Sequence, residues 1–222
     1  MKLTLEEANK IMATYNGNLS LYGRDDITEL PEGLKVKGYL DLAGTQITKL
    51  PDNLKVGGYL DLTGTQIVKL PDNLEVGSSL YLTRTPITKL PDNLEVGGAL
   101  DLEGTQINKL PDNLKVGGYL DLTGTRITEL PDNLQVSGYL YLAGTQITEL
   151  PDDLKVGETI FMPDGTKFEK FNENKSLNVA FTVNSDDNYF YISTEDGLNC
   201  KYSKKEYSLL NALEEYLYDY VI

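Results

Sequence analysis

Apolar positions recur every twenty residues over most of this chain. The apolar positions of one repeat, which return almost unchanged in the repeats that follow, are Leu60, Leu62, Ile67, Leu70, Leu74 and Val76. A fixed period of this length indicates a solenoid, in which each repeat forms one coil and buries its apolar side chains against neighbouring coils. The pattern therefore predicts a stack of coils with aliphatic columns running along it.

Within each coil, the run Tyr59-Leu60-Asp61-Leu62 alternates polar and apolar residues. Alternation with period two predicts a short strand whose two leucines point to one side, while Tyr59 and Asp61 point to the other. A coil of twenty residues is too short to hold a full return helix after this strand. We therefore expect stacked parallel strands about 4.8 Å apart, with an extended segment or a short 3₁₀ turn on the return side.

The two ends of the chain depart from the repeat. Residues 1–16 predict a capping helix, because Thr4 and Glu7 have the spacing of a capping box and Asn16-Gly17 is a typical stop. Leu5, Ala8, Ile11 and Met12 would then fall on one face of this helix. Residues 17–165 form the predicted solenoid. Residues 166–222 have a different composition, which predicts a hairpin (178–183 with 189–192) and a closing helix (203–220). This α+β segment is interpreted either as the C-terminal cap of the stack or as a small functional module.

The repeat resembles a known family. Residues Leu60-Asp61-Leu62-Thr63-Gly64-Thr65-Gln66-Ile67 are similar to the core of the leucine-rich repeat, and the Leu-Pro step resembles its short bacterial and bacteriophage type. Thr65 stands where that family has asparagine. The resemblance covers roughly residues 18–165 and implies an α/β solenoid whose parallel strands line a concave face that binds a protein.

The residues that alternate with the strand leucines form two polar and aromatic rows on this expected face. Tyrosines among carboxylates are typical of protein recognition, because tyrosine offers a large rigid contact area with a polar tip. Tandem duplication of a strand-favouring residue is the alternative explanation, but the rows vary between coils more than the aliphatic columns do. The candidate protein-binding residues are Tyr39, Asp41, Tyr59, Asp61, Tyr81, Asp101, Tyr119, Asp121, Tyr139, Tyr141 and Phe161.

Charge narrows the class of partner. The chain has 222 residues and a formal net charge of -14, which argues against direct binding of nucleic acid and fits a protein partner with a basic surface. Asp41 beside Asp61 and Asp101 beside Asp121 place like charges abreast, an arrangement that a basic partner relieves. One cysteine, no apolar membrane span and an acidic beginning predict a cytoplasmic protein, in a bacterium or an infected host cell.

The sequence offers little for catalysis. It contains no histidine, no phosphate-binding glycine loop and no nucleophile with a plausible base, so we expect no enzyme, catalytic residue, metal or cofactor. Carboxylate pairs about 5 Å apart also occur in retaining glycosidases, but any aspartate column in a solenoid produces that spacing. The leading hypothesis is a non-enzymatic protein-binding module. The alternative is an acidic, phage-encoded inhibitor that occludes a nucleic-acid-binding protein; the oligomeric state stays open.

Overall fold

The computed structural model describes residues 1–151, 154–165, 167–168, 181–185, 189–194 and 199–203. The chain divides into two compact units, Met1–Lys170 and Phe171–Ile222, which are treated separately below. None of the helices within these described residues has the length and apolar character needed to cross a bilayer.

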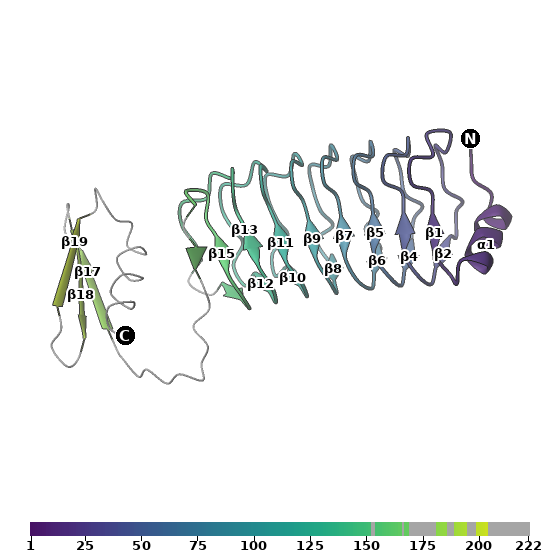
Figure 1. Cartoon of the computed structure of the whole chain (residues 1–222). Helices are drawn as coiled ribbons and strands as arrows, with labels where there is room; N and C mark the ends of the chain where they lie inside the picture. The colour runs from purple at the N-terminus through teal and green to yellow at the C-terminus, as the bar shows by residue number, and fades with distance from the viewer. Residues whose placement is uncertain (152–153, 166, 169–180, 186–188, 195–198, 204–222) are drawn as a thin grey trace. The chain divides into compact units, whose positions relative to one another are not determined.

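The first unit is a β-solenoid of stacked twenty-residue coils, as the periodicity predicted (Figure 1). Most coils contribute one two-residue strand to each of two sheets. Eight strands of the nine-stranded sheet run parallel in register: β1 (Leu19–Ser20), β3 (Leu40–Asp41), β5 (Leu60–Asp61), β7 (Leu80–Tyr81), β9 (Leu100–Asp101), β11 (Leu120–Asp121), β13 (Leu140–Tyr141) and β15 (Ile160–Phe161). The seven-stranded sheet contains β2 (Lys35–Val36), β4 (Lys55–Val56), β6 (Glu75–Val76), β8 (Glu95–Val96), β10 (Lys115–Val116), β12 (Gln135–Val136) and β14 (Lys155–Val156).

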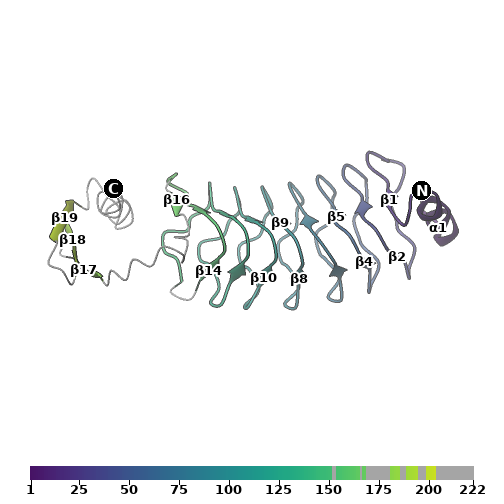
Figure 2. The ribbon, with the colours of Figure 1, turned by 60° about the horizontal axis from the view of Figure 1, so that its bottom comes forward.

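The seven-stranded sheet is the return side of the coil, where the sequence predicted an extended segment. Figure 2 shows its strands following one side of the stack and the odd-numbered strands another. The chain turns between the sheets at a column of close backbone contacts. There the Gly57 N–H donates to the Val36 carbonyl at 2.9 Å, and a Cβ on Gly57 would lie 2.2 Å from the Lys37 carbonyl oxygen. A side chain at Gly57 would therefore collide with the backbone of the preceding coil.

The expected α/β class is therefore correct only in its coarser part. The coils that the structure describes are built from strands and turns, and the helix among the described residues is α1 (Leu5–Thr14) at the N-terminal end. Twenty residues close a coil with two short strands and leave no length for a helix in each repeat. The protein is a parallel-strand β-solenoid with one N-terminal helix.

The predicted aliphatic columns form the core. Leu60, Leu62 and Ile67 have no exposed surface, and their equivalents in other inner coils are also buried. The threonine at the family asparagine position is buried as well. The hydroxyl of Thr65 donates to the Leu62 carbonyl of its own coil at 2.7 Å. The same bond recurs at Thr45, Thr85, Thr105, Thr125 and Thr145.

α1 covers the first coil with part of the face that the sequence indicated. Thr4 and Glu7 form the predicted capping box, and Ala8 and Met12 are buried at the end that contacts β1. Leu5 was expected on the same face but is 41% exposed. At the other end, β16 (Lys167–Phe168) pairs antiparallel with β15, so two residues extend the edge of the nine-stranded sheet.

The second unit contains a three-stranded antiparallel sheet in the order β17 (Phe181–Ser185), β18 (Tyr189–Thr194) and β19 (Asn199–Ser203). β17 pairs antiparallel with β18, in the region where the sequence predicted a hairpin of residues 178–183 and 189–192. The third strand was not predicted, because Asn199-Cys200-Lys201 lacks a run of strand-favouring residues. The predicted closing helix lies outside the described residues.

Candidate protein-binding surface

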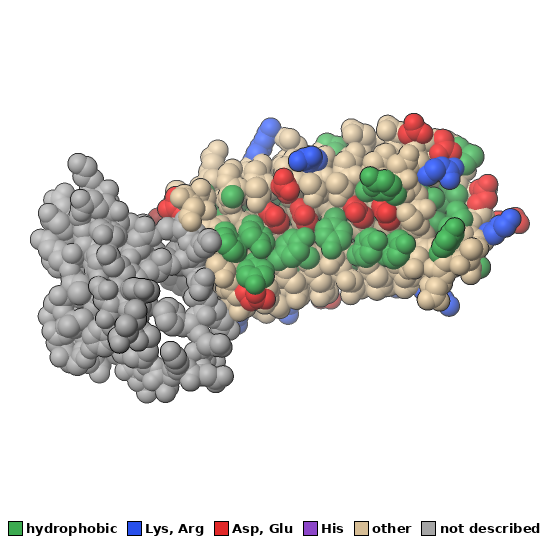
Figure 3. Space-filling view, viewed as in Figure 1, with side chains coloured by type: hydrophobic (Ala, Val, Ile, Leu, Met, Phe, Trp, Pro, Cys, Tyr) green, Lys and Arg blue, Asp and Glu red, His purple; other side chains and the backbone are tan. Residues whose placement is uncertain are grey.

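The outer surface of the nine-stranded sheet carries every residue of the two predicted rows. Along the seven parallel strands from β3 to β15, the second residue of each strand is Asp41, Asp61, Tyr81, Asp101, Asp121, Tyr141 or Phe161, and neighbouring ones are paired in register. Tyr39, Tyr59, Tyr119 and Tyr139 stand just before their strands in the adjacent row. We call this surface the Tyr/Asp face. Figure 3 shows a band of aromatic and apolar side chains along it, with carboxylates beside the band.

The aromatic rings make contacts with one another in two groups. In the first group, Tyr39 and Tyr59 are stacked with ring centroids 4.7 Å apart, and Tyr81 meets Tyr59 edge-on at 6.1 Å. In the second group, Tyr141 stacks on Phe161 at 4.8 Å, and both rings contact Tyr139. Tyr119 joins this second group by an edge contact with Tyr141 at 6.1 Å.

Stacking within the band decides what a partner can touch. Tyr39 and Tyr59 are nearly parallel, at 4°, so they turn ring faces toward each other. The two faces that meet cover each other and are not open to a ligand. Hydroxyl tips and ring edges suit a protein surface, where tyrosine combines apolar contact with hydrogen bonding.

The aspartates have a structural task that the sequence did not reveal. In each, one carboxylate oxygen accepts a hydrogen bond from the backbone N–H two residues later, an Asx turn that ends the strand. These bonds join Asp41 to Ala43, Asp61 to Thr63, Asp101 to Glu103 and Asp121 to Thr123, at 3.1, 2.9, 3.0 and 2.8 Å. The second oxygen takes no part in this turn, and that of Asp41 accepts from the Ser20 hydroxyl at 3.2 Å.

Tyr81 and Tyr141 stand where β3, β5, β9 and β11 have this capping aspartate. A tyrosine ring cannot accept the hydrogen bond from the N–H two residues later as a short carboxylate does, so both coils give up an Asx turn. Simple duplication of the coil would have kept the aspartate. The exchange of a cap for an aromatic side chain at two positions favours a surface role for these rings.

The hydroxyls of the inner tyrosines are held in their neutral form. Burial, followed by the negative charge of Asp101, raises the pKa of Tyr119 to about 12. Burial and the Asp41 carboxylate raise the pKa of Tyr59 for the same reason. Tyr139 is 38% exposed, and a hydrogen bond with Glu158 raises the pKa of its hydroxyl. Each therefore remains a hydrogen-bond donor at neutral pH.

Glu158 was not singled out from the sequence, although a signal was present. It stands in the corner column where most coils have glycine or serine, so its size and charge mark a departure from the repeat. Glu103 is a similar case, in a column of threonine and alanine, and it lies half-buried two residues after Asp101. Both add negative charge near the two rows.

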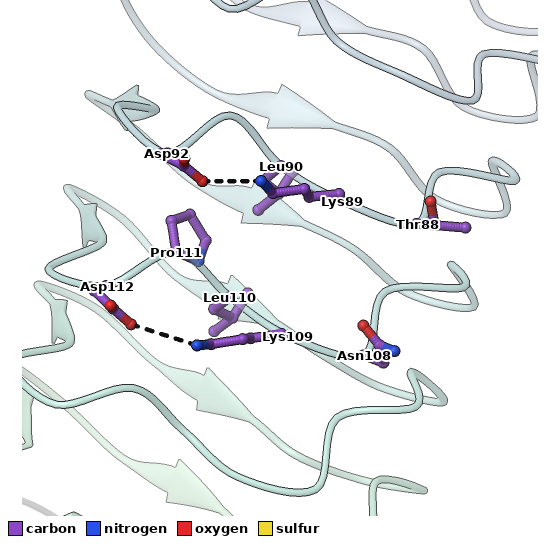
Figure 4. A pocket seen from close by; sticks show the side chains of 9 residues that line it. All are labelled: Thr88, Lys89, Leu90, Asp92, Asn108, Lys109, Leu110, Pro111 and Asp112. Carbon is purple, nitrogen blue, oxygen red and sulfur yellow. Dashed lines mark ion pairs between the residues drawn. The ribbon is translucent and has the colours of Figure 1, made fainter.

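Elsewhere on the solenoid, several cations are paired with carboxylates of the chain itself. Lys55 forms an ion pair with Glu75 on the seven-stranded sheet. At the Leu-Pro corner, Lys89 pairs with Asp92 at 3.2 Å and Lys109 with Asp112 at 3.9 Å. Figure 4 shows these last two pairs lining a shallow groove of about 530 Å³ between successive coils. The groove is lined by the Lys–Asp ion pairs that recur from coil to coil, and it brings together no nucleophile with a base.

The Tyr/Asp face differs, because neither row contains lysine or arginine between residues 39 and 161. Among the described residues, no group of three His, Cys, Asp or Glu side chains is placed to hold a metal ion. Comparisons with models of protein families, with curated proteins and with solved structures find no match to this chain.

Proposed function

We propose that this chain is a protein-binding module that holds its partner on the Tyr/Asp face. One observation carries the proposal: an unbroken strand surface combines contacting tyrosines with carboxylates that have no cation in their rows. Aromatic anchors with polar tips are enriched in protein interfaces, and like charges abreast favour a partner that supplies the opposite charge. The partner surface is accordingly basic.

The repeat itself supports a related proposal, that the coils are a variant of the leucine-rich repeat. Leu60 and Asp61 of the Leu60-Asp61-Leu62 run form a parallel strand, as in that family's core. Thr65 stands at the family asparagine position and makes a buried hydrogen bond to the coil's own backbone. A threonine with one hydroxyl donor is enough for this bond.

Affinity capture from the source cell tests the binding proposal. The face variant replaces Tyr59 and Tyr119 by alanine and Asp61 and Asp121 by asparagine, which keeps the Asx turns because the amide oxygen accepts the same bond. A control variant, Glu75→Gln with Glu95→Gln, removes the same number of charges from the seven-stranded sheet. We expect a protein retained by the wild-type chain and the control but lost from the face variant, with circular dichroism spectra that show all three chains folded at the capture temperature. Retention by all three chains contradicts the proposal.

The in-register pairs Asp41–Asp61 and Asp101–Asp121 support a second candidate, an inhibitor that covers a nucleic-acid-binding protein. A row of carboxylates can compete with phosphates for lysine and arginine. Competition between the chain and DNA for the captured protein tests this candidate and should weaken steeply as salt rises. If DNA and the chain bind the captured protein together, this candidate is excluded and the binding module remains.

A further inference from the structure

The Tyr/Asp face has a longer period than the coil. Read along the nine-stranded sheet from β3, the second strand residues are Asp41, Asp61, Tyr81, Asp101, Asp121 and Tyr141. The unit Asp-Asp-Tyr thus occurs twice, while the aliphatic columns repeat in every coil. Parallel strands are about 4.8 Å apart, so equivalent points of the two units are separated by about 14 Å.

Each unit suits one cationic side chain. Two carboxylates lie on adjacent strands, and each has one oxygen that accepts from its own backbone. The other oxygen can face a ligand at Asp61, Asp101 and Asp121, whereas that of Asp41 also accepts from the Ser20 hydroxyl. A tyrosine ring follows on the next strand. A guanidinium group has planar donors that can reach two carboxylates and can also lie against an aromatic ring. The rows supply no cation of their own, whereas Lys55 and Glu75 satisfy each other on the other sheet.

We infer that the partner presents an extended segment that lies along the two units and carries two arginine or lysine residues four positions apart. This inference rests on the proposed binding function. In an extended chain, alternate side chains share a side, and residues four apart are about 13.6 Å from each other. On a helix, side chains of one face recur after seven or eleven residues, at about 10.5 or 16.5 Å. The extended chain matches the spacing of about 14 Å, and the helix does not.

Synthetic peptides test the spacing directly. Each peptide carries two arginines in the same threonine-rich background, at separations of two, three, four or six residues, and is titrated against the full chain by fluorescence anisotropy at about 0.15 M salt. We expect separation four to bind at least tenfold more tightly than separation three, which directs the arginines to opposite sides. Equal affinities at all separations overturn the inference, because they indicate unspecific attraction to an acidic protein. Tighter binding of a helical peptide with arginines seven or eleven apart overturns it too.

Single substitutions test whether each Asp-Asp-Tyr unit binds one of the two arginines. Asp61→Asn removes a charge from the first unit and Asp121→Asn from the second, and both keep the Asx turn. Either substitution should reduce the best peptide to the affinity of one with a single arginine, whereas Glu75→Gln with Glu95→Gln should change nothing. If peptides show no spacing preference but the face variant still loses the captured protein, the spacing inference fails and the binding proposal stands. If the face variant changes neither measurement, both fail.

Discussion

The rigidity of the coil stack can be measured by opening a cavity in it. Leu114 is 2% exposed and occupies the same place in its coil as Leu94 and Leu134. Its carbonyl accepts from Gln135 N–H at 3.0 Å, and Gly117 N–H donates to Val96 at 3.0 Å. These bonds hold the coils on both sides at a fixed spacing, so the gap left by Leu114→Ala cannot close. Buried leucine-to-alanine changes cost about 2 to 5 kcal/mol, and the rigid backbone places this one at about 3 to 5 kcal/mol.

Leu154 provides the matched control, because it has the same place in the last full coil but is only partly buried. Leu154→Ala removes the same atoms from a site that already touches solvent, and we expect a loss of about 1 to 2 kcal/mol. Urea unfolding followed by circular dichroism gives both free energies of unfolding, with the slope m as a check that the transition is unchanged. Equal losses in the two variants, or a loss below about 1 kcal/mol for Leu114→Ala, would show that the coils collapse onto the cavity and refute the reasoning.

Three further predictions concern single polar groups. Thr105→Val should lower the free energy of unfolding in urea by about 1 kcal/mol or less. The Leu102 carbonyl loses its 2.8 Å hydrogen bond from the Thr105 hydroxyl but still accepts from the backbone N–H at position 105. A loss above about 3 kcal/mol contradicts this. Asp121→Ala should lower the free energy of unfolding by about 1 kcal/mol, because it removes the 2.8 Å bond from Thr123 N–H. Asp121→Asn should be close to neutral. Equal losses in the two variants would mean that the charge, and not the turn, matters. The pKa of Tyr119 is raised to about 12 in the folded chain, so its stabilising effect is complete below the ordinary tyrosine pKa of about 10 and is lost as pH rises from there to about 12. Tyr119→Phe should flatten this fall and remove one tyrosine's share of the tyrosinate absorbance that develops near pH 12. An unchanged titration contradicts the assigned pKa.

The period of the sequence was enough to predict the coils, their buried columns and the strand at Leu60–Asp61. Repetition supplies this information many times over, so one irregular coil does not obscure it. The second sheet could not be predicted with the same certainty, because a strand as short as Lys55–Val56 shows no alternation that separates it from a turn. The exposure of Leu5 was not predicted, because the helical pattern identifies the apolar face of the helix but not how much of that face the first coil covers.

The candidate surface was predicted in its placement but not in its bonding. Alternation alone puts Tyr59 and Asp61 on the outer side of the strand. It does not show that Asp61 accepts from Thr63 N–H. The sequence alone does not distinguish a carboxylate that caps its own strand from one that binds a partner. The contrast between Asp61 and Tyr81 acquires its meaning only when the lost turn bond is known.

The uniform register of the coils makes the length of this protein adjustable in whole steps. Removing residues 71–90 would join Leu70 to Pro91 at equivalent points of the backbone and leave the neighbouring strands able to pair as before. The surface would nevertheless change in kind, since Asp61 would then lie beside Asp101 and the two separate pairs would become four consecutive carboxylates. Gain or loss of one coil can thus rewrite what the molecule recognises while its architecture stays the same.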